Sequence, residues 1–156
     1  MKSQLFPVSF VSKCEQELFQ AVLLGDLKRK ADILNDLGNY HDGVGEQDTA
    51  LYYYNLTLQI DKQLDNDEGK CSVLYNIGRV LFKQVRLDEA LESFQKSLGF
   101  AEQFGDWQIA WDRVRFIAEI YRIRGEYDKE FRVLCAFESL KDNSARLTRK
   151  RINKLS

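Results

Sequence analysis

The sequence contains a single proline, Pro7, among its 156 residues. Because proline gathers in turns and at the edges of sheets, a β-rich fold of this length usually contains several. The sequence also lacks any apolar run near the roughly 18 residues that a membrane-spanning helix needs. Apolar residues nevertheless make up 44% of the chain and charged residues 30%, enough for a core and a charged surface. These features favour an all-α fold and predict no membrane insertion.

Cysteine and histidine are scarce as well. Cys14, Cys71 and Cys135 lie far apart and form no CxxC pair, and His41 is the one histidine. This pattern fits neither a disulfide framework nor a zinc site, and it is typical of reduced thiols in a cytoplasmic protein. Glycine-rich phosphate loops and nucleophile motifs are missing too. We therefore expect no cofactor, no metal, no catalytic activity and a cytoplasmic location.

The sequence does contain an internal repeat of 40 residues. A small residue that follows a branched apolar one recurs at Gly38, Gly78 and Ala118. Around these positions apolar residues recur at i, i+3, i+4 and i+7, as amphipathic helices require. A small residue lets two helix axes approach closely, and such pairs stack into repeats. We therefore predict antiparallel helix pairs, with helices at 11–24, 28–43, 47–64, 68–84, 88–104, 107–124 and 128–141 and a possible eighth near 144–154.

The repeated motifs resemble those of the tetratricopeptide repeat (TPR) family. The matching segments are Asp36-Leu37-Gly38-Asn39, Asn76-Ile77-Gly78-Arg79 and Arg86-Leu87-Asp88-Glu89-Ala90, with Gly-Asp pairs at 25–26 and 105–106. The period of 40 is similar to a 40-to-42-residue subclass that includes kinesin light chain, Pins-type adaptors and Rap-type bacterial regulators. The pattern differs from that of the family at His41, Ala118 and Glu130. The resemblance implies a right-handed superhelical α-solenoid of about seven helices that binds proteins and catalyses no reaction.

We expect residues 1–156 to form a single domain of this kind. Residues 9–27 match the second half of a repeat at Leu18 and Leu24, which align with Leu58 and Leu64 forty residues later. An unrelated capping helix would cover the same end of the stack, so both interpretations stay open. The other expected parts are repeats at 28–66, 67–106 and 107–142 and a basic cap or tail at 143–156.

The resemblance further implies a peptide-binding groove lined by the first helix of each pair. An asparagine amide can pair with both the donor and the acceptor of a peptide backbone, and arginine can bind acidic groups through two bonds. Aromatic residues add apolar contact. The basic clamp that some family members use for a terminal carboxylate is missing, because Asn35, Asp112 and Phe116 occupy its positions. The candidate groove residues are Asn35, Asn39, Tyr75, Asn76, Arg79, Phe82, Lys83, Arg115, Glu119 and Arg122.

Two other functions compete with peptide binding. An incomplete first repeat leaves an apolar end face around Leu18, Phe19, Val22 and Leu23, through which the chain would form a homo-oligomer. The segment 143–156 has five basic residues and no acidic one, which suggests nucleic acid or an anionic surface as a partner. The rest of the chain has 18 basic and 24 acidic residues, a net charge of −6 that would repel a polyanion. We therefore favour a protein or peptide ligand over nucleic acid.

Overall fold

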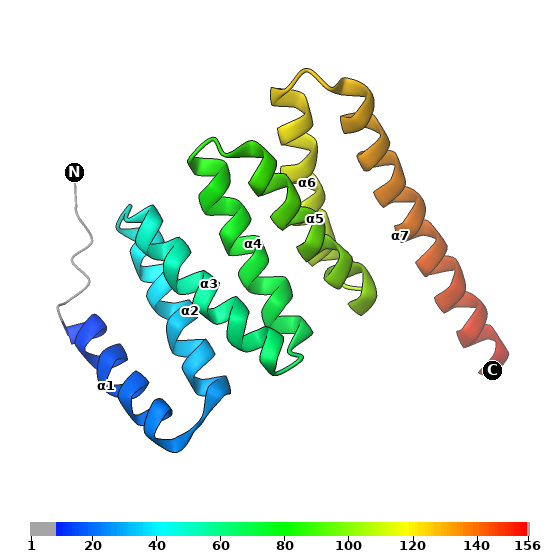
Figure 1. Ribbon diagram of the computed structural model, residues 1–156. Helices are drawn as coiled ribbons and strands as arrows, with labels where there is room; N and C mark the ends of the chain where they lie inside the picture. The colour runs from blue at the N-terminus through cyan, green and yellow to red at the C-terminus, as the bar shows by residue number, and fades with distance from the viewer. Residues whose placement is uncertain (1–8, 156) are drawn as a thin grey trace. The chain divides into compact units, whose positions relative to one another are not determined.

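The computed structural model describes residues 9–155, with the side chains of residues 10–142 and 145. Within that range it contains seven helices and no strand (Figure 1). The helices are α1 (Ser9–Leu24), α2 (Leu27–Gly43), α3 (Gln47–Gln63), α4 (Asp67–Lys83), α5 (Leu87–Phe104), α6 (Trp107–Ile123) and α7 (Tyr127–Leu155). The predicted all-α fold of about seven helices is therefore confirmed.

The C-terminal part of the helix map is wrong. We predicted a helix that ends at residue 141 and a possible separate one near 144–154, whereas α7 runs without a break from Tyr127 to Leu155. The segment between the two predicted helices contains neither glycine nor proline, the residues that most often end a helix. Nothing in the local sequence therefore interrupts α7.

The helices form two compact units, a first unit up to Val80 and a second unit from Leu81 onward. In the first unit α2 packs against α1 and α3, and in the second α6 packs against α5 and α7 (Figure 1). The division falls inside α4, within the predicted repeat at 67–106. The single domain, the repeat boundaries and the right-handed superhelix therefore stay predictions.

The turns between helices recur at an interval of 20 residues. Helices α2 to α7 begin at residues 27, 47, 67, 87, 107 and 127. Two residues before each start, at positions 25, 45, 65, 85, 105 and 125, the backbone has a positive φ between 49° and 86°. In each turn the next N–H donates to the carbonyl five residues earlier, the bond that closes a Schellman motif. Two such 20-residue units make up the 40-residue period of the sequence.

Alternate turns differ in how the following helix is capped. Asp26, Asn66 and Asp106 each accept the N–H three residues onward, at 2.9, 3.1 and 3.0 Å. Glu46 and Arg86, which occupy the turns between them, form no side-chain cap. Side-chain oxygens thus satisfy exposed N–H groups at the starts of α2, α4 and α6. The junctions predicted at 25–26, 65–66 and 105–106 are confirmed as helix boundaries.

Gly38 marks the closest approach of α2 and α3. A Cβ atom on this glycine would lie 2.5 Å from the ring of Tyr54, which is 1% exposed. The ring is fixed in place because its hydroxyl donates to Asn39 Oδ1 at 2.8 Å. The small residue of the repeat motif therefore has the packing role that the sequence predicted.

Helix α1 follows the same burial pattern as the later second helices. Cys14 and Ala21 join Ile33 and Leu37 of α2 in a buried cluster, and Leu18 packs against that cluster. Ala21 is 1% exposed, as Ala101 eighty residues later is 0% exposed. Leu18 lies one helical turn from both Cys14 and Ala21, so it shares their inward face. Its predicted place in an exposed apolar end face is therefore wrong.

We expect Gly38→Ala to lower the free energy of unfolding by about 1–3 kcal/mol, because the new methyl group would overlap the immobilised Tyr54 ring. The loss would outweigh the gain of up to about 1 kcal/mol that alanine brings to a helix interior. Urea denaturation monitored by circular dichroism measures the difference. The control is Gly99→Ala in α5, where a Cβ meets nothing within 4 Å, so this variant should be more stable than the parent. Equal stability gains in both variants would contradict the packing role of Gly38.

Candidate functional site

Five of the ten candidate groove residues lie in the first unit, on α2 and α4. Asn35, Tyr75, Asn76 and Arg79 are half-buried, and Asn39 is exposed. The amide of Asn76 donates to Asn35 Oδ1 at 3.4 Å, a long hydrogen bond between α4 and α2. The structure therefore brings the two asparagines together from positions 41 residues apart in the chain.

Arg79 completes this first-unit face. Its guanidinium lies 3.9 Å from the Asp42 carboxylate and 5.8 Å from the centre of the Tyr75 ring. At these distances the charge interacts with both an acid and an aromatic face. Part of the capacity of Arg79 to bind a ligand is thus already used within the chain.

Asn39 has a structural role that the sequence did not indicate. Its side-chain oxygen accepts the hydroxyl of Tyr54. Burial raises the pKa of Tyr54 to about 12, with a further rise from Asp42 and an opposing effect of Arg79. Tyr54 is therefore a protonated donor at neutral pH, and Asn39 anchors a core ring at the edge of the groove.

The other five candidates lie in the second unit, at the end of α4 and on α6. Phe82, Arg115 and Glu119 line one pocket of about 310 Å³ together with Phe116. Phe116 is held by the buried Phe94, with ring centres 4.6 Å apart in a stacked arrangement. The structure thus gathers three predicted residues around one pocket with an aromatic floor.

Charged partners surround that pocket. Arg115 lies 4.0 Å from Asp112, and Arg122 forms an ion pair with Glu119. Arg122 and Lys83 are exposed and do not line the pocket. Exposed ion pairs of this kind contribute little to stability, so these side chains can exchange partners at small cost.

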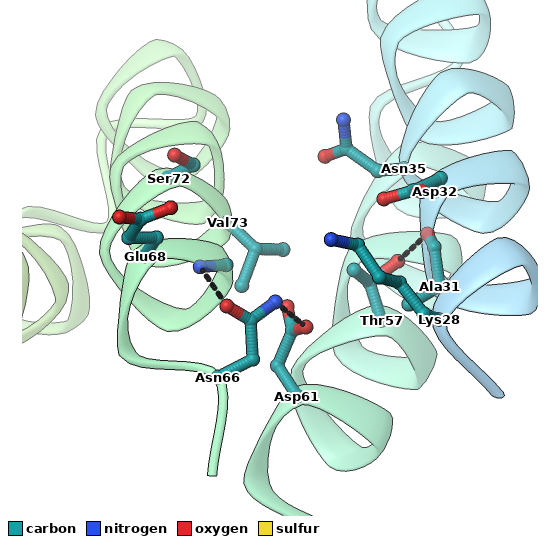
Figure 2. A pocket seen from close by; sticks show the side chains of 11 residues that line it. Lys28, Ala31, Asp32, Asn35, Thr57, Asp61, Asn66, Glu68, Ser72 and Val73 are labelled. Atoms are coloured by element: carbon teal, nitrogen blue, oxygen red, sulfur yellow. Dashed lines mark hydrogen bonds between the residues drawn. The ribbon is translucent and has the colours of Figure 1, made fainter. Parts of the chain in front are cut away.

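A second pocket, in the first unit, was missed by the sequence analysis. It has a volume of about 310 Å³ and lies between α2, α3 and α4 (Figure 2). Asn35 is the one candidate groove residue in its lining. The lining consists of Lys28, Ala31, Asp32, Asn35, Thr57, Asp61, Asn66, Glu68, Gly69, Ser72 and Val73.

The floor of this first-unit pocket is a buried carboxylate. Asp61 is 2% exposed and accepts the Asn66 amide at 2.7 Å. A Cβ on Gly69 would lie 2.4 Å from Asp61 Oδ1, so only glycine leaves room for the carboxylate. Burial raises the pKa of Asp61, against the lowering effects of the Asn66 hydrogen bond and of Lys70, while Asp32 raises it further. One signal was present in the sequence, because forty residues to either side the position is alanine.

The described residues contain no helix with the length and hydropathy needed to cross a membrane. Among the same residues, no cluster of histidine, cysteine or acidic side chains could hold a metal ion. The candidate site therefore consists of polar, aromatic and charged side chains alone within the described part of the chain.

No family model matches the chain. A curated relative, "Outer dynein arm-docking complex subunit 4" of Danio rerio, is 29% identical over 128 residues, which cover 78% of this chain and 26% of the relative. The chain thus spans about a quarter of the length of this relative. A solved structure, "Crystal structure of MamA protein", is similar with a TM-score of 0.39 and 13% identity, over 88% of this chain and 94% of that one.

The TPR-like architecture rests on the turns and buried positions of the chain itself. Six turns in equal register, three capped junctions and a small residue under a buried ring define a repeat of helix pairs. The chain is a TPR-like helical repeat. The more specific likeness to the 40-to-42-residue subclass stays a prediction.

We expect Asp61→Asn to make the chain more stable at pH 7. Because burial raises the pKa of Asp61 in the folded state, the folded chain binds a proton more readily than the unfolded chain. The free energy of unfolding of the parent should therefore fall as the pH rises above the unfolded pKa of about 3.9. The asparagine variant should lack this fall and converge with the parent below that pH.

Urea midpoints measured between pH 3.5 and 7 provide the test. Glu15→Gln, on an exposed position of α1, is the control for the loss of one negative charge. If Asp61→Asn were less stable than the parent at every pH, Asp61 would be a stabilising member of the junction instead.

Proposed function

We propose that this chain is a non-catalytic protein-interaction module that binds a peptide or protein segment through its groove residues. The main support is the pocket lined by Phe82, Arg115 and Glu119, because three residues chosen from the repeat pattern meet around one cavity. An aromatic surface beside charged side chains is the composition typical of a protein-binding site.

The first-unit face supports the same proposal with different chemistry. Asn35 and Asn76 present amides that can pair with a peptide backbone, and Arg79 lies beside them on α4. Their mutual bond of 3.4 Å is long, so a ligand could replace it at little cost. A segment with both polar backbone and acidic groups would fit this face.

An adaptor or scaffold role agrees with the name of the curated relative, which describes a subunit of a docking complex. A cytoplasmic location is part of the proposal. Cys14 and Cys71 are buried free thiols, and Cys135 is an exposed free thiol. An exposed thiol of this kind persists where the surroundings are reducing.

Affinity capture from a native lysate would identify partners of the parent chain, whose affinities are then measured by titration. We expect Arg79→Ala and Arg115→Ala each to weaken a groove-bound partner at least tenfold, or about 1.4 kcal/mol. Lys96→Ala, at an exposed position of α5, is the control and should bind as the parent does. A partner with unchanged affinity for both arginine variants would place the binding site away from the groove.

Self-association through α1 is a second candidate, favoured by one observation. Phe19, Val22, Leu23 and Leu24 are 64%, 56%, 69% and 75% exposed. Four neighbouring apolar side chains at the end of a repeat form the kind of surface that a second copy would cover.

Sedimentation of Phe19→Glu tests this second candidate. We expect the parent chain to sediment above its monomer mass of 18.2 kDa at high concentration and Phe19→Glu to sediment as a monomer, because the new charge cannot be buried. Gln20→Glu adds the same charge at an exposed neighbour and should behave as the parent. A monomeric parent chain would rule the candidate out.

A further inference from the structure

The first-unit pocket contains a carboxylate where the repeat otherwise has alanine. Asp61 aligns with Ala21 and Ala101, which are 1% and 0% exposed. A buried carboxylate is unfavourable unless a cation or several donors stabilise it. Its hydrogen bond comes from a neutral amide, that of Asn66. Lys70, the cation that acts on it, pairs with Asp67 at 2.5 Å.

The second unit fills the aligned place with an arginine of its own. Arg113 aligns with Val73 of the pocket lining and is 6% exposed. Its Nε donates to Ser97 Oγ at 3.0 Å and its Nη1 donates to the Ile109 carbonyl at 3.2 Å. Ser97 and Ile109 in turn align with Thr57 and Gly69, two further lining residues. The geometry of the repeat thus accepts a guanidinium group at the place where the first unit has a pocket.

The lining of the pocket suits a positive charge. Of its four ionisable side chains, Asp32, Asp61 and Glu68 are acidic and Lys28 is basic. Figure 2 shows Asp32 and Glu68 on opposite walls, with the hydrogen-bonded Asp61 and Asn66 at the base. A guanidinium presents five donors in one plane, whereas an ammonium is a compact point charge. The planar group matches acceptors that lie on several walls.

The volume of about 310 Å³ is at the lower end of the range for ligand sites. It suits one long side chain, not a folded peptide. We propose that the first-unit pocket binds an arginine side chain of a protein ligand, with the guanidinium against Asp61. This inference rests on the proposed function, because the arginine belongs to a segment bound at the groove that Asn35 also lines.

Lys28 is the competing cation. It lies on α2 and is exposed, so its flexible stem can turn the ammonium toward solvent when another cation enters. Its removal should therefore increase affinity for the ligand, whereas a structural role as the partner of Asp61 would make removal unfavourable for folding.

The test is an NMR titration of the whole chain with N-acetyl-arginine methylamide. N-acetyl-citrulline methylamide is the matched probe, because it keeps the shape and lacks the charge. We expect saturable shifts of the Gly69 backbone amide and the Asn66 side-chain amide, with a dissociation constant of roughly 1–10 mM. Citrulline should bind at least tenfold more weakly. Asp61→Asn should weaken the arginine probe at least tenfold, and Lys28→Gln should strengthen it.

Three results would overturn the inference. They are no saturable shift at Gly69 and Asn66, equal binding of citrulline, and unchanged binding to Asp61→Asn. Equal binding of N-acetyl-lysine methylamide would show that the pocket recognises charge alone and would overturn the assignment to arginine. The exposed variant Lys28→Gln keeps the test decisive if Asp61→Asn alters the fold. Failure here with an Arg115-dependent partner intact would leave the proposed function standing.

Discussion

The left-handed turn that recurs every 20 residues is the constraint on which the rest of the structure depends. Four of its six positions are glycine, but Asp65 and Val85 adopt the same positive φ of 49° and 61°. A β-branched residue is unfavourable in this conformation, and Val85 is 72% exposed and gains little burial in return. The Schellman bonds and the packing of the flanking helices therefore impose the turn even where the residue opposes it. Equal turns give equal helices, and equal helices place residues 40 apart in equivalent surroundings.

Equivalence of this kind makes each departure from the repeat informative. Alanine at positions 21 and 101 shows what the junction needs for packing alone, which is a small apolar side chain. The carboxylate of Asp61 exceeds that need and requires Asn66 and Gly69 to accommodate it. Arg113 exceeds it in the opposite sense, because a guanidinium replaces the valine of the first unit and is satisfied by Ser97 and a carbonyl. Buried polar groups are costly unless they are satisfied, so both departures point to polar chemistry at the junctions.

The sequence was sufficient for features set by neighbouring residues. Glycine–aspartate pairs, the small residue at 38 and the apolar periodicity located all seven helix starts to within two residues. It failed where the outcome depends on contacts between helices. The pocket draws its lining from α2, α3 and α4, and no spacing along one helix indicates it. Asn39 was assigned to a ligand because its oxygen was assumed to face the groove, whereas the hydroxyl of Tyr54 on α3 occupies it. Leu18 was assigned to the end face because its alignment with Cys14 and Ala21 along one helical face was not weighed.

The pocket and the helix boundary share the same atoms, which limits how binding and folding can be separated. Asn66 accepts the Gly69 N–H that begins α4 and donates to Asp61 with the other end of its amide. Loss of Asn66 would therefore remove a helix cap and a pocket wall together. Replacement of Asp61 by alanine would leave the Asn66 donor without its acceptor, which is costly in a buried site. Asparagine at position 61 keeps the acceptor and the shape and removes only the charge, so a change in cation binding in that variant is attributable to electrostatics and not to the loss of the turn.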